Sequence, residues 1–340
     1  METIWFVLWG VLWAAYFVLD GYDLGAGVLM PFIARDEADR KKIYNAIGPF
    51  WDGNEVWLIV AGGVTFAAFP GTYATMFSAL YSVLMLILFA LILRGAGLAL
   101  REEAEKQSHR AFWDWFFIIG SFIAALLLGV AFANFFKGIP IDAEGIFHGN
   151  LFTLLNPYGL AGGLLFLTFF LTHGAIWLTF KTEGELHDKA MNYAGRLWVI
   201  LVVLSVIFLI ATAFATDIYR NYLNSPVLFV LPLLAVAGLL LTGIYIKQVD
   251  WKKAWFASAG YFFFVTLFGV VGMYPALLPS SLNPAFSRTI HNSASSPLTL
   301  KIMLVVALIF VPLAIIYQAW AYKVFSGKVG GEHSGYHEGV

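Results

Sequence analysis

The sequence predicts an all-α polytopic membrane protein with nine transmembrane helices. Of its 340 residues, 60% are hydrophobic and only 12% are charged, against about 25% charged in a typical soluble domain. Nine apolar stretches are long enough to cross a hydrocarbon core, which takes about 20 helical residues. The cationic residues also alternate between two sets of connections. These three observations favour a membrane bundle over any soluble fold.

The composition excludes several classes of protein. A net charge of -1 leaves no excess of cations for binding nucleic acid. The chain has no cysteine, which excludes disulfides, zinc ribbons, iron–sulfur clusters and cysteine nucleophiles.

The apolar stretches are continuous, as in membrane helices, and lack the alternation of barrel strands. The first is not a signal peptide, because it is too long and no Lys or Arg precedes it. We treat residues 1–340 as one integral-membrane domain. The expected spans are 4–33, 50–69, 72–94, 112–136, 157–180, 194–216, 226–246, 254–276 and 300–323.

The distribution of cations predicts the orientation, because cytoplasmic connections carry most Lys and Arg. One set of connections holds Arg35, Arg40, Lys41, Lys42, Arg94, Arg101, Lys106, Arg110, Lys181, Lys189, Arg196, Lys247, Lys252, Lys253, Lys323 and Lys328. The other set holds only Lys137, Arg220, Arg288 and Lys301. We therefore expect the N-terminus outside and the C-terminus in the cytoplasm. Residues 326–340 are rich in Gly and His and are expected to form a flexible cytoplasmic tail.

The first span contains two acids, which are costly inside a membrane. Asp20 lies roughly 24 Å below the outer end at helical rise. Asp23 follows three residues later on the same side of the helix. Gly21 and Gly25 form a pair of small residues that lets a neighbouring helix come close. Acids and close helix packing are therefore expected together in the inner half of the membrane.

The second span begins with further acids, Asp52 and Glu55, after Pro49, which is expected in the first helical turn. Because this span starts from the cytoplasmic side, its acids lie at about the depth of Asp20 and Asp23. Arg94 closes the third span and Asp114 opens the fourth, at the same level. The sequence thus predicts one layer of ionisable groups near the cytoplasmic side.

Two interpretations of this layer compete. For Asp114 and Arg94 we favour the simpler one, in which Asp114 is stabilised by the helix dipole and Arg94 extends its charge toward water. For Asp23 and Asp52, a proton-conducting or ion-pairing role is an equal alternative. Asp20 either caps a broken turn or bonds to a neighbouring helix.

Counting ligands argues against a haem in this chain. Only His173 of the seven histidines lies within a span, whereas buried haems need axial ligands from inside the bundle. A hydrogen-bonded packing role is favoured for His173. The residues alone indicate a subunit that moves protons or supports a partner and is not the redox centre.

Together, these segments resemble subunit II of the cytochrome bd quinol oxidases over nearly the whole chain. The most specific stretch is the Trp-Asp-Gly-Asn block within 49–58. The other matching segments are 19–27, 61–70, 119–122, 129–134, 156–160, 184–187 and 275–281.

The resemblance implies two four-helix bundles plus one peripheral helix, in a complex that oxidises quinol and reduces dioxygen to water. The partner, subunit I, would hold two b-type haems and haem d, whereas this subunit would hold no haem. The complex would lie in the bacterial cytoplasmic membrane, among its lipids. The resemblance is also compatible with a small single-span accessory subunit in the complex. Some members hold a structural quinone in subunit II, but no residue set here matches such a site.

The resemblance also implies a proton path along the subunit interface. The family's aspartate in the Trp-Asp-Gly-Asn block corresponds to Asp52, and the second acid of the first span to Asp23. Glu55 completes the expected path, although relatives can have an amide at this position. Two alternatives stay open, namely a stand-alone proton- or cation-coupled transporter and a purely structural scaffold.

Overall fold

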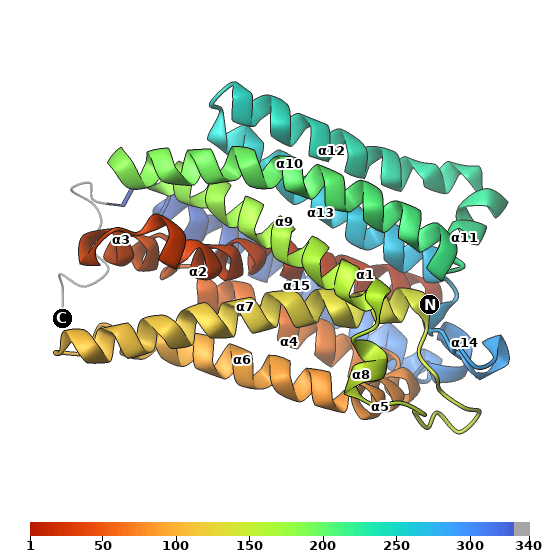
Figure 1. Cartoon of the computed structure of the whole chain (residues 1–340). Coiled ribbons are helices and arrows are strands. Elements are labelled where there is room, and N and C mark those ends of the chain that lie inside the picture. The colour runs from red at the N-terminus through yellow and green to blue at the C-terminus, as the bar shows by residue number, and fades with distance from the viewer. Residues whose placement is uncertain (330–340) are drawn as a thin grey trace.

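The computed structural model describes residues 1–329 as an elongated bundle of antiparallel helices (Figure 1). Within these residues, eight helical segments are long and apolar enough to cross a membrane. The all-α polytopic architecture is thereby confirmed. One end of the bundle, called here the cation-rich end, carries the connections at 34–36, 101–106, 182–183 and 248–250.

The long helices begin and end at the following residues. They are α1 (Glu2–Leu19), α2 (Gly21–Ile33), α4 (Trp51–Ala68), α6 (Tyr81–Leu100), α7 (Gln107–Lys137), α9 (Pro157–Lys181), α10 (Gly184–Ala215), α12 (Val230–Lys247), α13 (Trp251–Met273) and α15 (Pro297–Val324). The shorter elements are α3 (Glu37–Ile47), α5 (Pro70–Ala79), α8 (Leu151–Leu154), α11 (Ile218–Asn224), η1 (Pro226–Phe229), β1 (Ala276–Leu278), η2 (Pro284–Phe286), β2 (Arg288–Thr289) and α14 (Ile290–Ser293).

Helix α9 lies at the centre of the packing, against α2, α7, α10 and α13. Helices α9, α10, α12 and α13 contact one another, while α1–α2, α4, α6 and α7 lie on the other side of α9 and α13 (Figure 1). Aromatic rings fill the junction, where Phe169 of α9 stacks on Phe262 of α13 with ring centroids 3.8 Å apart. Helix α15 packs mainly against α4, and most of its surface is exposed.

The first span is nearly continuous through Asp20, which separates α1 from α2. The backbone N–H of Asp20 donates to Tyr16, and its carbonyl accepts from Leu24. The expected close approach at Gly25 is confirmed, because a Cβ there would overlap the carbonyl oxygen of Phe170 in α9. The absent side chain lets two helix backbones touch, which is how small residues bring membrane helices together.

The second and third expected spans need a correction. Pro70, which separates the two expected spans, occupies the first turn of α5, where its missing N–H costs no helical hydrogen bond. The stretch expected as one span at 72–94 is divided at Leu80 into the end of α5 and the start of α6. Helix α6 then continues to Leu100. Pro49 lies before the first turn of α4. Helix α4 is not among the eight most apolar segments, because its first turns hold polar residues.

The loop between α13 and α15 contains a small two-stranded antiparallel sheet that the sequence analysis did not anticipate. Ala276 of β1 pairs with Thr289 of β2. Here the chain is extended and leaves the helical hydrogen-bond pattern, so backbone groups must find partners in another segment.

Most of the expected flexible tail at 326–340 lies outside the described residues. His333 and His337 belong to this part of the tail. In the described part, the Lys181 ammonium donates to the carbonyls of Phe325 and Gly327. The N–H of Val329 in turn donates to the carbonyl of Lys181 at 2.8 Å. The chain after α15 thus packs against the end of α9.

We predict that Gly25→Ala destabilises the protein by about 1–3 kcal/mol, because the added methyl group must push α2 and α9 apart. Gly195→Ala is a matched control, since a Cβ at Gly195 in α10 meets no atom within 4 Å. The measurement is the midpoint of thermal unfolding of the purified protein in detergent. Equal midpoints for the two variants would contradict the proposed contact.

Candidate functional site

A fully buried ion pair joins α1–α2 to α6. The Arg94 guanidinium donates from Nη1 to Oδ2 of Asp20 at 2.8 Å and from Nη2 to Oδ1 at 2.5 Å. Neither side chain is exposed to solvent. Such a two-point contact matches the planar guanidinium to the carboxylate and holds both in one orientation. The expectation that Arg94 extends toward water is therefore wrong, because its charge is satisfied inside the bundle.

Further carboxyl groups surround this single cation. Glu55 of α4 lies 3.4 Å from Nη1 of Arg94 and is partly exposed. Asp23 is fully buried one helical turn after Asp20. Two carboxyl groups thus contact one guanidinium and a third lies one turn away, so this single cation cannot neutralise all three if each is ionised. Because uncompensated charge is costly in a membrane interior, this cluster favours binding of a proton, water or another cation.

Asp23 belongs to a hydrogen-bond network centred on Asn54 of α4. The Asn54 amide donates to Oδ2 of Asp23 at 2.7 Å and to the hydroxyl of Tyr22 at 2.8 Å. The Tyr22 hydroxyl lies 2.6 Å from that of Tyr322 in α15. Within the described structure, Oδ1 of Asp23 is buried and has no hydrogen-bond partner. This oxygen is an open acceptor in an otherwise well-connected network.

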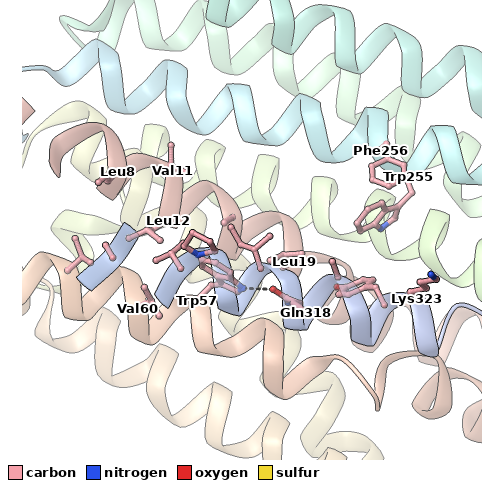
Figure 2. A pocket seen from close by; sticks show the side chains of 18 of the residues that line it. Leu8, Val11, Leu12, Leu19, Trp57, Val60, Trp255, Phe256, Gln318 and Lys323 are labelled. Carbon is pink, nitrogen blue, oxygen red and sulfur yellow. Dashed lines mark hydrogen bonds between the residues drawn. The ribbon is translucent and has the colours of Figure 1, made fainter. Parts of the chain in front are cut away.

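The same network attaches α15 to the bundle. Gln318 donates to Oδ1 of Asn54 at 2.8 Å, and Tyr322 donates to the same oxygen at 3.1 Å. The indole N–H of Trp57 donates to the Gln318 carbonyl oxygen at 2.8 Å, as drawn in Figure 2. These side chains come from helices far apart in the sequence, so the buried amide of Asn54 binds a helix that otherwise contacts little.

Asp52 lies apart from the buried cluster, on the outside of the described bundle. It shares one side of α4 with exposed Val56, Ile59, Gly63 and Phe66, and we call these five residues the α4 outer face. Glu55 borders this face and connects it to the buried cluster through Arg94. The structure therefore brings Glu55 and Asp23 close to one ion pair and leaves Asp52 at the surface leading to it.

Asp114 forms a separate cluster at the cation-rich end. Its carboxylate accepts from Arg40 at 2.7 Å, from Arg101 at 2.6 Å and from Tyr44 at 3.0 Å. Because Asp114 is the eighth residue of α7, the expected role as an acid in the first helical turn is wrong. Burial and the charge of Asp114 raise the pKa of the Tyr44 phenol well above its usual value, so the hydroxyl stays protonated and donates. Through these bonds α3 is held against α7 and the end of α6.

His173 makes the contacts of a packing side chain. Its Nδ1 lies 2.7 Å from the hydroxyl of Ser258, and its ring stacks on Phe169 and Trp255. Among residues 1–329, no group of three His, Asp or Glu side chains is arranged to hold a metal ion.

The sequence analysis missed several residues of the cluster. Asn54 lies in the recognised Trp-Asp-Gly-Asn block, but its central position between α2 and α15 depends on the packing of distant helices. The sequence did contain a signal for this contact, namely the polar residues Gln318 and Tyr322 within an apolar span. A polar side chain in such a span needs a hydrogen-bond partner on another helix.

Comparisons with known proteins agree with one another. The profile of the family described as "Cytochrome bd terminal oxidase subunit II" matches residues 1–325. The chain is 36% identical to "Cytochrome bd-I ubiquinol oxidase subunit 2" of Escherichia coli strain K12, covering 97% of this chain and 95% of that protein. It is 33% identical to "Cytochrome bd ubiquinol oxidase subunit 2" of Bacillus subtilis strain 168, covering 97% of each. A chain of the bd oxidase structure from Geobacillus thermodenitrificans has the same fold, with a TM-score of 0.77, 17% identity, and coverage of 95% of this chain and 98% of that one.

We predict that Arg94→Gln destabilises the protein by about 3–5 kcal/mol, because Asp20 would stay buried without its counter-charge. The double variant with Asp20→Asn should recover part of this loss, since an amide needs no counter-charge. The measurement is the midpoint of thermal unfolding.

Arg35→Gln is the control for this prediction. It breaks an exposed ion pair with Glu185, which should cost no more than about 1 kcal/mol. An Arg94→Gln protein as stable as the Arg35→Gln protein would contradict a structural role for the buried pair.

Proposed function

The chain belongs to the family of cytochrome bd terminal oxidase subunit II, and on that premise we propose how its buried acids serve the oxidase. It is a subunit of a bd-type quinol oxidase, a quinol:oxygen oxidoreductase complex of the bacterial cytoplasmic membrane. The transporter alternative is not favoured, since these relatives are named as oxidase subunits. The proposed role is to support subunit I and to deliver protons from the cytoplasm.

The chemistry of the complex requires a proton supply of this kind. Reducing dioxygen to water consumes protons, and hydrocarbon cannot provide them. In our proposal, two b-type haems and haem d in subunit I supply the electron transfer and oxygen chemistry, and quinol supplies the electrons. Taking protons only from the cytoplasmic side separates charge across the membrane, worth about 2.3 kcal/mol per charge per 100 mV.

The observation that carries the proton role is the excess of carboxyl groups around Arg94. Asp52 and Glu55 lie three residues apart and share one side of α4. Glu55 contacts Arg94, and Arg94 binds Asp20, with buried Asp23 one turn further. In the proposed path a proton enters at Asp52, passes to Glu55 through water, and is held within the buried cluster. The unpartnered Oδ1 of Asp23 supports its place as an acceptor.

We propose that the α4 outer face contacts subunit I. Val56, Ile59 and Phe66 are 46%, 73% and 60% exposed. A Cβ at Gly63 meets no atom within 4 Å, so the backbone is open to a second helix, as at many membrane-helix contacts. Docking of subunit I here would enclose Asp52 between the two chains and give its carboxyl group a direct route to the partner.

We also propose the complete nine-span topology with the N-terminus outside. The eight apolar segments become nine with α4, and the cation-rich end then faces the cytoplasm in agreement with the distribution of Lys and Arg. Most of α15 is exposed, which supports its place as the peripheral helix. A small single-span accessory subunit remains part of the proposal on the resemblance alone.

We predict that Asp52→Asn lowers the rate of oxygen reduction per haem by about tenfold or more, since proton transfer by a positioned side chain typically contributes ~10²–10⁴-fold. The measurement is quinol-driven oxygen consumption by the purified complex, normalised to haem content so that a loss of assembly is separated from a loss of turnover.

Asp188→Asn is the matched control, because Asp188 is an exposed acid of α10 outside the proposed path. It should leave oxygen consumption unchanged. Unchanged turnover in Asp52→Asn would favour the purely structural scaffold instead.

A second prediction concerns the partner. An affinity tag on this chain should co-purify a haem-bearing membrane subunit, because the α4 outer face is proposed to dock on subunit I. The measurement is the haem absorption spectrum of the purified complex beside that of the chain expressed alone. Haem bound by the chain alone, or no haem-bearing partner, would contradict the proposal.

A further inference from the structure

A long cavity separates α15 from the rest of the bundle. It has a volume of about 1030 Å³ and is lined by side chains of α1, α4, α9, α13 and α15 (Figure 2). Helix α15 is held at two places along the cavity. The indole N–H of Trp5 donates to the carbonyl of Leu300 near one end, and Gln318 bonds to Asn54 nearer the other. The walls between are mainly aliphatic and aromatic, so this space suits a hydrocarbon chain.

Three lysines line the cavity at its cation-rich end. Lys181 ends α9, Lys252 begins α13 and Lys323 lies in the last turn of α15. Lys181 is largely buried and donates to backbone carbonyls, which leave its charge uncompensated. Lys252 and Lys323 are exposed, and neither forms an ion pair with a carboxylate of residues 1–329. The mouth of an apolar cavity therefore carries concentrated positive charge.

Trp255 provides an independent indication of a ligand. It lines the cavity beside Lys252, and its indole Nε1 is buried without a hydrogen-bond partner in the described structure. A buried donor without an acceptor is costly. An oxygen atom of a molecule in the cavity would satisfy it.

From this arrangement we propose that the cavity binds an anionic phospholipid, with its phosphate at Lys252 and Lys323 and an acyl chain between α1 and α15. Basic pockets between membrane helices recognise anionic headgroups in this way. The Trp255 indole N–H donates to an oxygen of the phosphate or glycerol ester. The lipid carries negative charge because Lys252 and Lys323 lie exposed at the mouth, and buried Lys181 adds a third cation beside them.

The polar side chains deeper in the cavity do not favour a neutral polar headgroup such as a quinone. Both ends of the Gln318 amide are used, one by Asn54 and the other by Trp57. The Tyr322 hydroxyl is likewise bonded to Asn54 and Tyr22. Each of these groups therefore already has hydrogen-bond partners, whereas a phosphate at the mouth meets two lysines that form no ion pair within residues 1–329.

The test uses the purified complex after delipidation in mild detergent, titrated with phosphatidylglycerol or phosphatidylethanolamine and analysed by native mass spectrometry. The wild-type complex should bind phosphatidylglycerol far more tightly than phosphatidylethanolamine. Lys252→Gln with Lys323→Gln should weaken phosphatidylglycerol binding roughly 30-fold, from about 1 kcal/mol per cation near a lipid surface. Lys106→Gln with Lys247→Gln is the control, since it removes two exposed cations of the same end that do not line the cavity.

A third variant, Ala319→Phe, places a ring in the cavity without changing its charge. It should also weaken phosphatidylglycerol binding, because the acyl chain loses its space. Weakening by the lysine variant but not by Ala319→Phe would mean that only a phosphate group binds at the surface, which overturns the proposal. Equal binding of the two lipids, equal losses in the lysine variant and its control, or a quinone as the retained molecule would overturn it too. The inference does not require the oxidase role, which the co-purification experiment tests separately.

Discussion

The buried pair between Asp20 and Arg94 is the interaction on which the inner part of the bundle depends. It joins α1–α2 to α6 by two short hydrogen bonds between fully buried side chains. A charge buried there is stable only with its partner, so the helices must remain in register. The pair therefore positions the acids around it, with Glu55 on one side and Asp23 on the other.

The carboxyl groups around this pair exceed what stability alone requires, and the excess is what the proposed proton transfer would use. An apolar contact would join the same helices without burying charge, and one acid would suffice to neutralise one arginine. The additional acids instead create a site with proton-binding capacity beside a surface open to a partner. Because Asp52 lies on that surface and the cluster lies behind it, a subunit that completes the enclosure would also complete the proposed route.

Helix α15 shows how polar side chains organise a helix with little packing. Gln318 and Tyr322 attach it to Asn54 at one level, and Trp5 attaches it at another. Along much of its length the helix stands away from α1, which leaves the cavity. The acid cluster and the proposed lipid site therefore share one wall, since the hydrogen bonds that satisfy Asn54 also hold α15 in place.

Sequence alone determined the membrane class, the approximate spans and the presence of acids within them, because apolar length, charge bias and costly intramembrane carboxylates are local properties of the chain. It also identified the family through ordered motifs. The partners of the buried groups were decided only by the tertiary structure. Arg94 meets Asp20 across 74 positions and Gln318 meets Asn54 across 264, and such contacts depend on which helices pack together. For the same reason, periodicity did not show that Arg94 turns inward, that Asp114 anchors α3, or that a cavity separates α15 from α1.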